Sequence, residues 1–337
     1  MKYYSIFKSI MAVVLFAASS ITLYAQNNYE AQIAAIMHRL DSIEQVLAEA
    51  GIGADDASRT VMIDNGALPG VFSVSDKQMV RFSMGNLQYQ ASTNKWRFSK
   101  KQTAYAGASN NKVSATFSGW IDLFVWGTSG YHDASDKENI HYQPYSTSYQ
   151  VYDENRNNAF GYGPSKNKNG GNLTGKNAEY DWGVHNAISN GGDKKGVWRT
   201  LTSEEWIYLI EKRQTEMRYC LATVDGQSGL ILYPDNFTQP AGVEAPKIYN
   251  LGTQYADYTL TSIQWNQVEA AGAVFLPAAG YRVGTEAHSM GVDGFYWSST
   301  HENQDYANRV MFGSGVVGAE GSSGRFDAFA VRLVRAE

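Results

Sequence analysis

Two acidic segments of this chain have side chains that could bind a metal ion. One spans residues 133–138 and the other residues 153–155, and both supply carboxylate oxygens of the kind that calcium accepts. Neither has the twelve-residue spacing of an EF-hand loop or its final glutamate. The six histidines are scattered, with no His-Glu-x-x-His pattern and no other zinc spacing. We therefore predict solvated loops, no metal site and no cofactor.

Nucleophilic chemistry has equally little support. Cys220 is the only cysteine, which excludes an internal disulfide and a two-thiol redox pair, and its apolar neighbours predict a buried, inert thiol. Residues 170–177 come within one residue of a phosphate-binding loop, but Asn177 stands where a magnesium-binding hydroxyl belongs and no predicted strand precedes it. No Gly-x-Ser-x-Gly elbow is present. We predict no catalytic residue and do not expect an enzyme.

The composition indicates a domain rich in strands. Glycine (32) outnumbers proline (7), tyrosine (22) is abundant, and charged residues make up only 18% of the chain, a balance typical of short strands joined by turns. The net charge of -5 provides no basic field for a phosphate backbone. Nucleic acid is therefore not an expected partner.

The first 25 residues have the pattern of a secretory signal. Lys2 and Lys8 precede an apolar run over residues 10–18, and a cleavage position follows Ala25. The run is shorter than the roughly 20 residues that a membrane-spanning helix needs. We predict export to the periplasm, the cell surface or the extracellular space, with no membrane span in the mature chain.

An amphipathic segment follows the signal and covers residues 26–51. Its apolar residues recur at steps of three and four and form a short heptad seam. This seam predicts either self-association, with a trimer weakly favoured, or a helix that docks on its own domain. The seam residues are Ile33, Ile36, Leu40, Ile43 and Leu47. Residues 52–67 read as a linker, and residues 68–337 as one domain.

That domain begins and ends with predicted strands. Residues 78–84 and 328–334 are both apolar enough to need a partner, and pairing Met79–Phe82 with the last strand would bring the ends of the domain together. Thr202 and Glu205 form a capping box, which predicts a helix of two to three turns over residues 203–213. Further strands are expected at residues 71–74, 86–90, 95–98, 230–233, 273–277, 294–300 and 308–312. Residues 131–192 are expected to be extended loops ordered by aromatic anchors, among them Tyr145 and Trp182.

Two motifs together resemble a known family. They are Val-Trp-Arg-Thr-Leu-Thr-Ser-Glu-Glu-Trp at residues 197–206, and Gly-Phe-Tyr-Trp-Ser-Ser-Thr at residues 294–300 leading to Phe-Ala-Val-Arg-Leu-Val-Arg at residues 329–335. They resemble secreted Bacteroidetes and Fibrobacter paralogous domains with a C-type-lectin-like fold. The first motif is also distantly similar to formylglycine-generating-enzyme-type domains, whose catalytic cysteine pair this chain lacks.

The resemblance implies an α+β fold over residues 68–337. It would consist of a small twisted antiparallel sheet, a flanking helix and long loop insertions, preceded by the short coiled-coil-like helix. Trp206 and Trp297 are expected in the core. The calcium-dependent sugar motifs of animal lectins are absent, since Ala241 follows Gln239-Pro240 and Ser298 follows Trp297.

In relatives that bind ligands, the contacts come from the irregular segment before the final strand, which is His301 to Asp327 here. Its amide, acid, guanidinium and phenol groups can hydrogen-bond a sugar or a protein surface. We predict contacts from Asn303, Tyr306, Asn308 and Arg309. The same segment adds His301, Asp305, Arg325 and Asp327 as further candidates.

The sequence therefore favours a secreted or surface-displayed lectin-like protein that recognises a glycan or a protein. Some relatives of this fold are hypervariable targets of diversity-generating retroelements, which is one form such recognition takes. Two alternatives remain open. One is a structural cell-envelope or fibre subunit, and the other is an enzyme related to the formylglycine-generating-enzyme branch.

Overall fold

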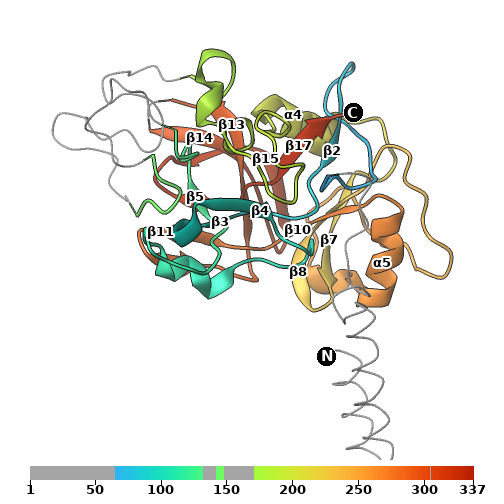
Figure 1. The fold of residues 1–337 in the computed structure, drawn as a ribbon. Coiled ribbons are helices and arrows are strands. Elements are labelled where there is room, and N and C mark those ends of the chain that lie inside the picture. The colour runs from blue at the N-terminus through green and yellow to red at the C-terminus, as the bar shows by residue number, and fades with distance from the viewer. Residues whose placement is uncertain (1–64, 132–141, 148–170, 304) are drawn as a thin grey trace, which may run out of the picture. The chain divides into compact units, whose positions relative to one another are not determined.

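Figure 1 shows the computed structural model, which describes residues 65–131, 142–147, 171–303 and 305–337. All of them belong to one compact unit, Thr60–Glu337. The predicted signal, the helix at 26–51 and nearly all of the linker lie outside the described residues. Within the described part, no helix has the length and apolar character to cross a membrane.

The first and last strands of the domain lie side by side in one four-stranded sheet with the order β1-β2-β17-β6. β2 (Met79–Phe82) pairs antiparallel with β17 (Leu333–Ala336), and Val334 lies opposite Phe82. This confirms the predicted partner of the last strand. β1 (Phe72–Ser73) and β6 (Arg199–Thr200) complete the sheet.

The end of the chain nevertheless differs from the single strand predicted over residues 328–334. It forms β16 (Ala328–Phe329) and then β17, and β16 belongs to another sheet, with the order β12-β11-β16-β5. Every residue from 328 to 334 is buried, so the chain has no exposed face here. Between the two strands, the Val331 carbonyl accepts a hydrogen bond from the backbone N–H of Leu87 as the chain passes from one sheet to the other. The other strands of the second sheet are β5 (Phe124–Val125), β11 (Tyr281–Val283) and β12 (Glu286–His288).

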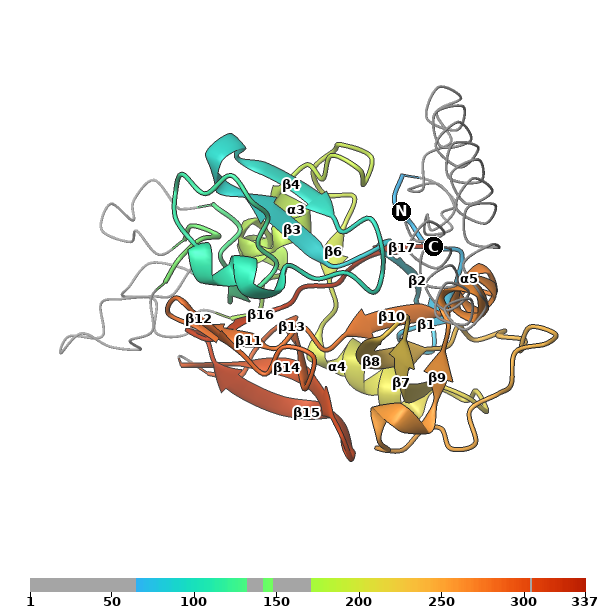
Figure 2. The ribbon, with the colours of Figure 1, turned by 90° about the horizontal axis from the view of Figure 1, so that it is seen from below.

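A further sheet of order β10-β8-β7-β9 packs with helix α5 (Ser262–Ala270) (Figure 2). Trp265 of α5 meets Phe275 of the sheet edge-on, with ring centroids 5.7 Å apart. Sequence patterns predicted only parts of this region, and the helix was missed because its residues show little amphipathic periodicity. The strands are β7 (Tyr219–Val224), β8 (Gln227–Leu232), β9 (Thr259–Leu260) and β10 (Val274–Pro277).

The segment from His301 to Asp327 is not the irregular segment that the resemblance implied, and the strand predicted within it at residues 308–312 is confirmed as part of a longer one. Most of the segment forms β14 (Tyr306–Gly313) and β15 (Val316–Gly324), which join β13 (Gly294–His301) in a three-stranded antiparallel sheet. Gly315, with a φ of 85°, makes the tight turn between β14 and β15. β15 was not predicted because it is rich in glycine and serine, and glycine has a low strand propensity.

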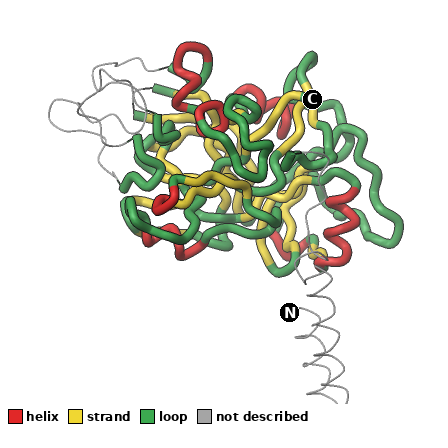
Figure 3. The backbone as a smooth tube through the Cα atoms, viewed as in Figure 1, coloured by secondary structure: helices red, strands yellow, loops and turns green. Residues whose placement is uncertain are grey.

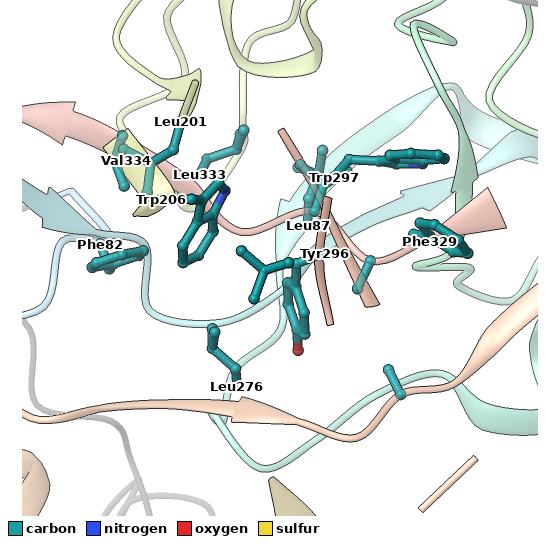
Figure 4. Packing of buried hydrophobic residues seen from close by; sticks show 14 of the residues in the cluster. Phe82, Leu87, Leu201, Trp206, Leu276, Tyr296, Trp297, Phe329, Leu333 and Val334 are labelled. Carbon is teal, nitrogen blue, oxygen red and sulfur yellow. The ribbon is translucent and has the colours of Figure 1, made fainter. Parts of the chain in front are cut away.

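The helix predicted at residues 203–213 is present. Thr202 and Glu205 form the capping box, α4 covers Ser203–Ile207, and a π-helical turn η4 continues it over Tyr208–Lys212. Trp206 enters the core from α4, and Trp297 enters it from β13 (Figure 4). Both tryptophans are 1% exposed or less, which confirms their expected burial.

Loops fill much of the path between these short elements (Figure 3). The structure is thus mixed, with mainly small sheets and few helices, in agreement with the α+β class. The remaining elements are η1 (Ala91–Thr93), η2 (Gly107–Lys112), η3 (Gly175–Tyr180), α3 (Trp182–His185), η5 (Tyr255–Asp257) and the hairpin of β3 (Leu87–Gln90) with β4 (Lys95–Phe98).

A buried polar network lies inside this fold. The guanidinium of Arg332, 1% exposed, donates to Gln102 Oε1 at 2.7 Å. The same oxygen accepts the backbone N–H of Phe275, while Gln102 Nε2 donates to Glu269 Oε1 at 2.8 Å. One amide therefore connects a buried cation, a buried carboxylate and strand β10.

Replacing Gln102 by alanine should lower the free energy of unfolding by about 3 kcal/mol, because several buried polar groups would lose their partner at once. Urea unfolding monitored by tryptophan fluorescence measures the change. Gln214→Ala is the matched control, since this exposed glutamine makes one hydrogen bond to the Lys212 carbonyl, and a change within about 0.5 kcal/mol is expected there. Equal effects of the two substitutions would contradict a stabilising network.

Candidate functional site

The turn between β13 and β14 carries several of the predicted contact residues. Asn303 Oδ1 accepts hydrogen bonds from the backbone N–H groups of Asp305 and Tyr306, at 2.9 and 3.1 Å. The Tyr306 carbonyl in turn accepts from the N–H of Asn303 at 3.1 Å. The phenol side chain of Tyr306 is 46% exposed. The turn therefore holds an aromatic side chain toward solvent on a backbone fixed from both sides.

Asn308 and Arg309 lie on opposite faces of β14, because successive side chains of a strand alternate. Asn308 is on the face of Tyr306, and its Nδ2 donates to Glu302 Oε2 at 3.2 Å. Arg309 lies over the ring of Phe295, 5.7 Å from its centroid, and donates to Ser323 Oγ. The structure thus brings Tyr306 and Asn308 together and directs Arg309 away from them.

Arg325 lies beneath this turn. It is 5% exposed, and its guanidinium lies 4.8 Å from the centroid of the Trp126 ring. Its backbone N–H donates to the Asp305 carbonyl at 2.8 Å. From this position Arg325 stabilises the turn and has little surface to offer a ligand.

His301 ends β13 and contacts Asn172. Asn172 Oδ1 accepts the backbone N–H of His301 at 3.2 Å, and the ring Nδ1 lies 3.1 Å from the same oxygen. Because that oxygen is an acceptor, Nδ1 carries the proton and donates. Burial and then the charge of Arg325 lower the pKa of His301, which favours the neutral ring. Asn172 begins a segment that leads away from the sheet.

That segment, residues 172–186, reaches a small pocket that sequence analysis did not locate. The pocket has a volume of 210 Å³. Ser129, at its wall, donates to the Glu179 carbonyl and also connects the pocket to η3. The described residues that line the pocket are Tyr89, Ala91, Asn94, Ala115, Ser129, Gly130, Gln143, Tyr145, His185 and Asn186.

Two of the aromatic anchors expected in residues 131–192 differ in how deeply they are buried. Trp182 is fully buried, as an anchor should be, whereas Tyr145 is half-buried and lines the pocket. Asn, Gly, Ser and Tyr enrichment was the only signal for this pocket, and it could not show which loops converge.

A larger concavity of 380 Å³ lies at the start of α4, between Val74 and Tyr208. The acid at its wall, Glu205, is held in two ways. It closes the capping box, and it makes a bidentate ion pair with Arg199 at 2.6 and 2.7 Å. Those contacts give Glu205 a structural role.

The described residues contain no group of three or more His, Cys, Asp or Glu side chains that could hold a metal ion. Cys220 is fully buried, with its Sγ 3.1 Å from Tyr233 Oη. Burial raises the pKa of this thiol to about 12, so it stays protonated. The predicted buried, inert cysteine is confirmed.

Comparison with known proteins gives one match. A family described as a domain of unknown function (DUF8237) matches residues 247–334, a stretch that includes α5 and all three strands of the β13-β14-β15 sheet. No curated protein and no solved structure matched the chain.

The last predicted contact residue, Asp327, gives a pH prediction. Burial raises the pKa of its carboxyl to about 6. Because this exceeds the unfolded value of about 3.9, the folded state binds the proton more tightly. The resulting stabilisation is fully present below about pH 4 and is lost as the pH rises through 6.

We expect the Asp327 carboxyl carbon to titrate with a midpoint near 6 by NMR, assigned through its disappearance in Asp327→Asn. In that variant the free energy of unfolding should fall less steeply between pH 4 and 7. Some slope should remain, because burial also raises the pKa of Asp122 to about 6. A midpoint near 4, or an unchanged slope, would contradict the burial of this group.

Proposed function

We propose that this protein is an exported, lectin-like recognition protein, with a C-type-lectin-like fold, that binds a glycan or protein ligand at the turn between β13 and β14. The observation that carries the proposal is the exposed Tyr306 on a turn whose backbone is fixed by Asn303. A rigid, amphipathic aromatic side chain provides contact area at a low cost in conformational entropy.

The support beneath the turn favours binding over a solvated loop. Trp297 of β13 packs on Phe329, with ring centroids 4.3 Å apart, and its indole N–H donates to the Phe124 carbonyl. The sheet that carries the turn is therefore anchored in the core. Binding residues commonly lie on loops positioned by such a rigid scaffold.

Several features of the fold agree with the proposed family. The first and last strands pair, a capped helix begins within the first motif, and loops connect the short strands. Residues 26–51 would assemble several copies, so that weak single sites gain avidity. The match to a domain of unknown function is compatible with this proposal and adds no ligand.

The double substitution Tyr306→Ala/Asn308→Ala tests the site. If both side chains contact the ligand, affinity for the glycans or proteins bound by the wild type should fall at least tenfold, in line with the loss of central interface contacts. A glycan array, followed by pull-down of surface proteins with quantified binding of each hit, provides the measurement.

Two controls make the result specific. Tyr249→Ala removes a tyrosine from a different part of the domain and should leave binding unchanged. Arg309→Ala changes the opposite face of β14 and should have a smaller effect than the double substitution. If the folded double variant keeps full affinity, the β13–β14 turn is not the recognition site.

A further inference from the structure

The pocket near Ser129 has the size of a site for one small ring. Its volume of 210 Å³ is below the roughly 300–1,000 Å³ of pockets that take drug-sized ligands. It is formed where five described parts of the chain converge, which are the β3–η1 region, Ala115, residues 129–130, residues 143–145 and the C-terminal end of α3. A ligand in it would be a single unit or the end of a longer chain.

The described residues that line the pocket carry no permanent charge, because none of them is Asp, Glu, Lys or Arg. The Nδ1 atom of His185 lies 2.7 Å from the Glu179 carboxylate. Among these described residues, a phosphate, sulfate or carboxylate ligand would find no permanent cation to offset the loss of its hydration. The lining therefore favours an uncharged ligand.

Asn186 presents an acceptor to this pocket. Its Nδ2 donates to the carbonyls of Ser129 and Trp182, at 2.9 and 3.1 Å. Both partners can only accept, which fixes the orientation of the amide and uses both of its N–H bonds. The Oδ1 atom has no hydrogen bond within the described residues, so it is available to accept from a ligand hydroxyl.

His185 offers a second acceptor by the same logic. The carboxylate of Glu179 accepts at Nδ1, so in the neutral ring Nδ1 carries the proton, and the lone pair of Nε2 has no hydrogen-bond partner among the described residues. Tyr131 packs against both His185 and Tyr180, with ring centroids 5.4 and 5.0 Å apart. The imidazole is thus oriented before any ligand arrives.

Two tyrosines and a glutamine add adaptable groups. Tyr89 donates its hydroxyl to Asn94 Oδ1 at 3.0 Å and keeps acceptor capacity on its oxygen. In the part of the chain that the structure describes, no hydrogen bond uses the Gln143 amide or the Tyr145 hydroxyl. The half-buried ring of Tyr145 also provides an apolar face.

We propose that this pocket binds one neutral sugar ring, a hexose or an N-acetylhexosamine, of a glycan. Fixed acceptors match the many hydroxyl donors of such a ring, neutrality matches its lack of charge, and the phenol ring of Tyr145 matches its C–H face. The inference rests on the proposed recognition function but uses a second contact region. Residues 172–186 connect the pocket to the β13–β14 turn through Asn172 and His301.

Binding of methyl glycosides to protein produced from the full-length sequence tests the proposal. Saturation-transfer NMR and calorimetry would use methyl glucoside, galactoside, mannoside and N-acetylglucosaminide, with methyl glucuronide as the charged comparison. At least one neutral glycoside should bind more tightly than the glucuronide. Gln143→Ala/Tyr145→Phe should weaken it about tenfold, the effect expected for two lost hydrogen bonds.

Tyr249→Phe is the matched control for loss of a phenol hydroxyl and should leave affinity unchanged. A neutral glycoside that binds the pocket variant as tightly as the wild type overturns the pocket assignment, and so does tighter binding of the glucuronide or no binding of any glycoside. The Tyr306→Ala/Asn308→Ala variant separates the two proposals. If only that variant loses glycan binding, the recognition function is retained at the turn and the pocket is rejected. If only the pocket variant loses glycan binding, the pocket is retained and the turn is rejected as the recognition site.

Discussion

Arg332 is a cation with almost no solvent contact, and residues from distant parts of the chain meet around its guanidinium. Burial lowers the pKa of Arg332 to about 10, so the guanidinium remains charged at neutral pH and needs compensation. Gln102 supplies the closest hydrogen bond, and the nearby carboxylate of Glu269 is reached through the same amide. Breaking such a buried arrangement at one point leaves an uncompensated charge, which is strongly destabilising. The parts of the chain that meet at Arg332 are therefore constrained to meet there.

This constraint extends to the candidate site. Asn86 lies 3.4 Å from the Arg332 guanidinium and donates through Nδ2 to Tyr296 Oη at 3.1 Å. Tyr296 belongs to β13, directly before Trp297, and its hydroxyl donates to the Pro277 carbonyl. The strand that carries the β13–β14 turn is thus tied to the interior on one face by hydrogen bonds and on the other by aromatic packing. A turn on such a strand can present a side chain without losing its shape.

Two parts of the molecule have polar groups to offer a ligand, and they differ in kind. At the β13–β14 turn, most predicted side chains already have partners in the protein, and the exposed phenol of Tyr306 is the main group directed outward. In the pocket, Asn186 and His185 use one side of each group for the protein and keep an acceptor on the other. Residues 172–186 connect the two regions along the chain, from Asn172 beside His301 to Asn186 in the pocket. The lack of permanent charge among the described pocket residues would select among ligands.

The sequence by itself determined the features that depend on local pattern or on unmistakable burial. The capping residues Thr202 and Glu205 predicted the helix start, the apolar ends of the domain predicted the pairing of β2 with β17, and Trp297 and Cys220 were expected in the core. The tertiary structure alone decided what depends on contacts between distant residues. It paired the strand expected at residues 308–312 with the unpredicted β15, buried Arg325 under Trp126, turned Arg309 away from Tyr306 and assembled the pocket from five described parts of the chain. Strand propensity in a glycine-rich segment is weak. Whether a polar side chain is bound inside the protein or left for a ligand depends on the partners that the fold brings to it, such as Ser323 for Arg309 and Ser129 for Asn186.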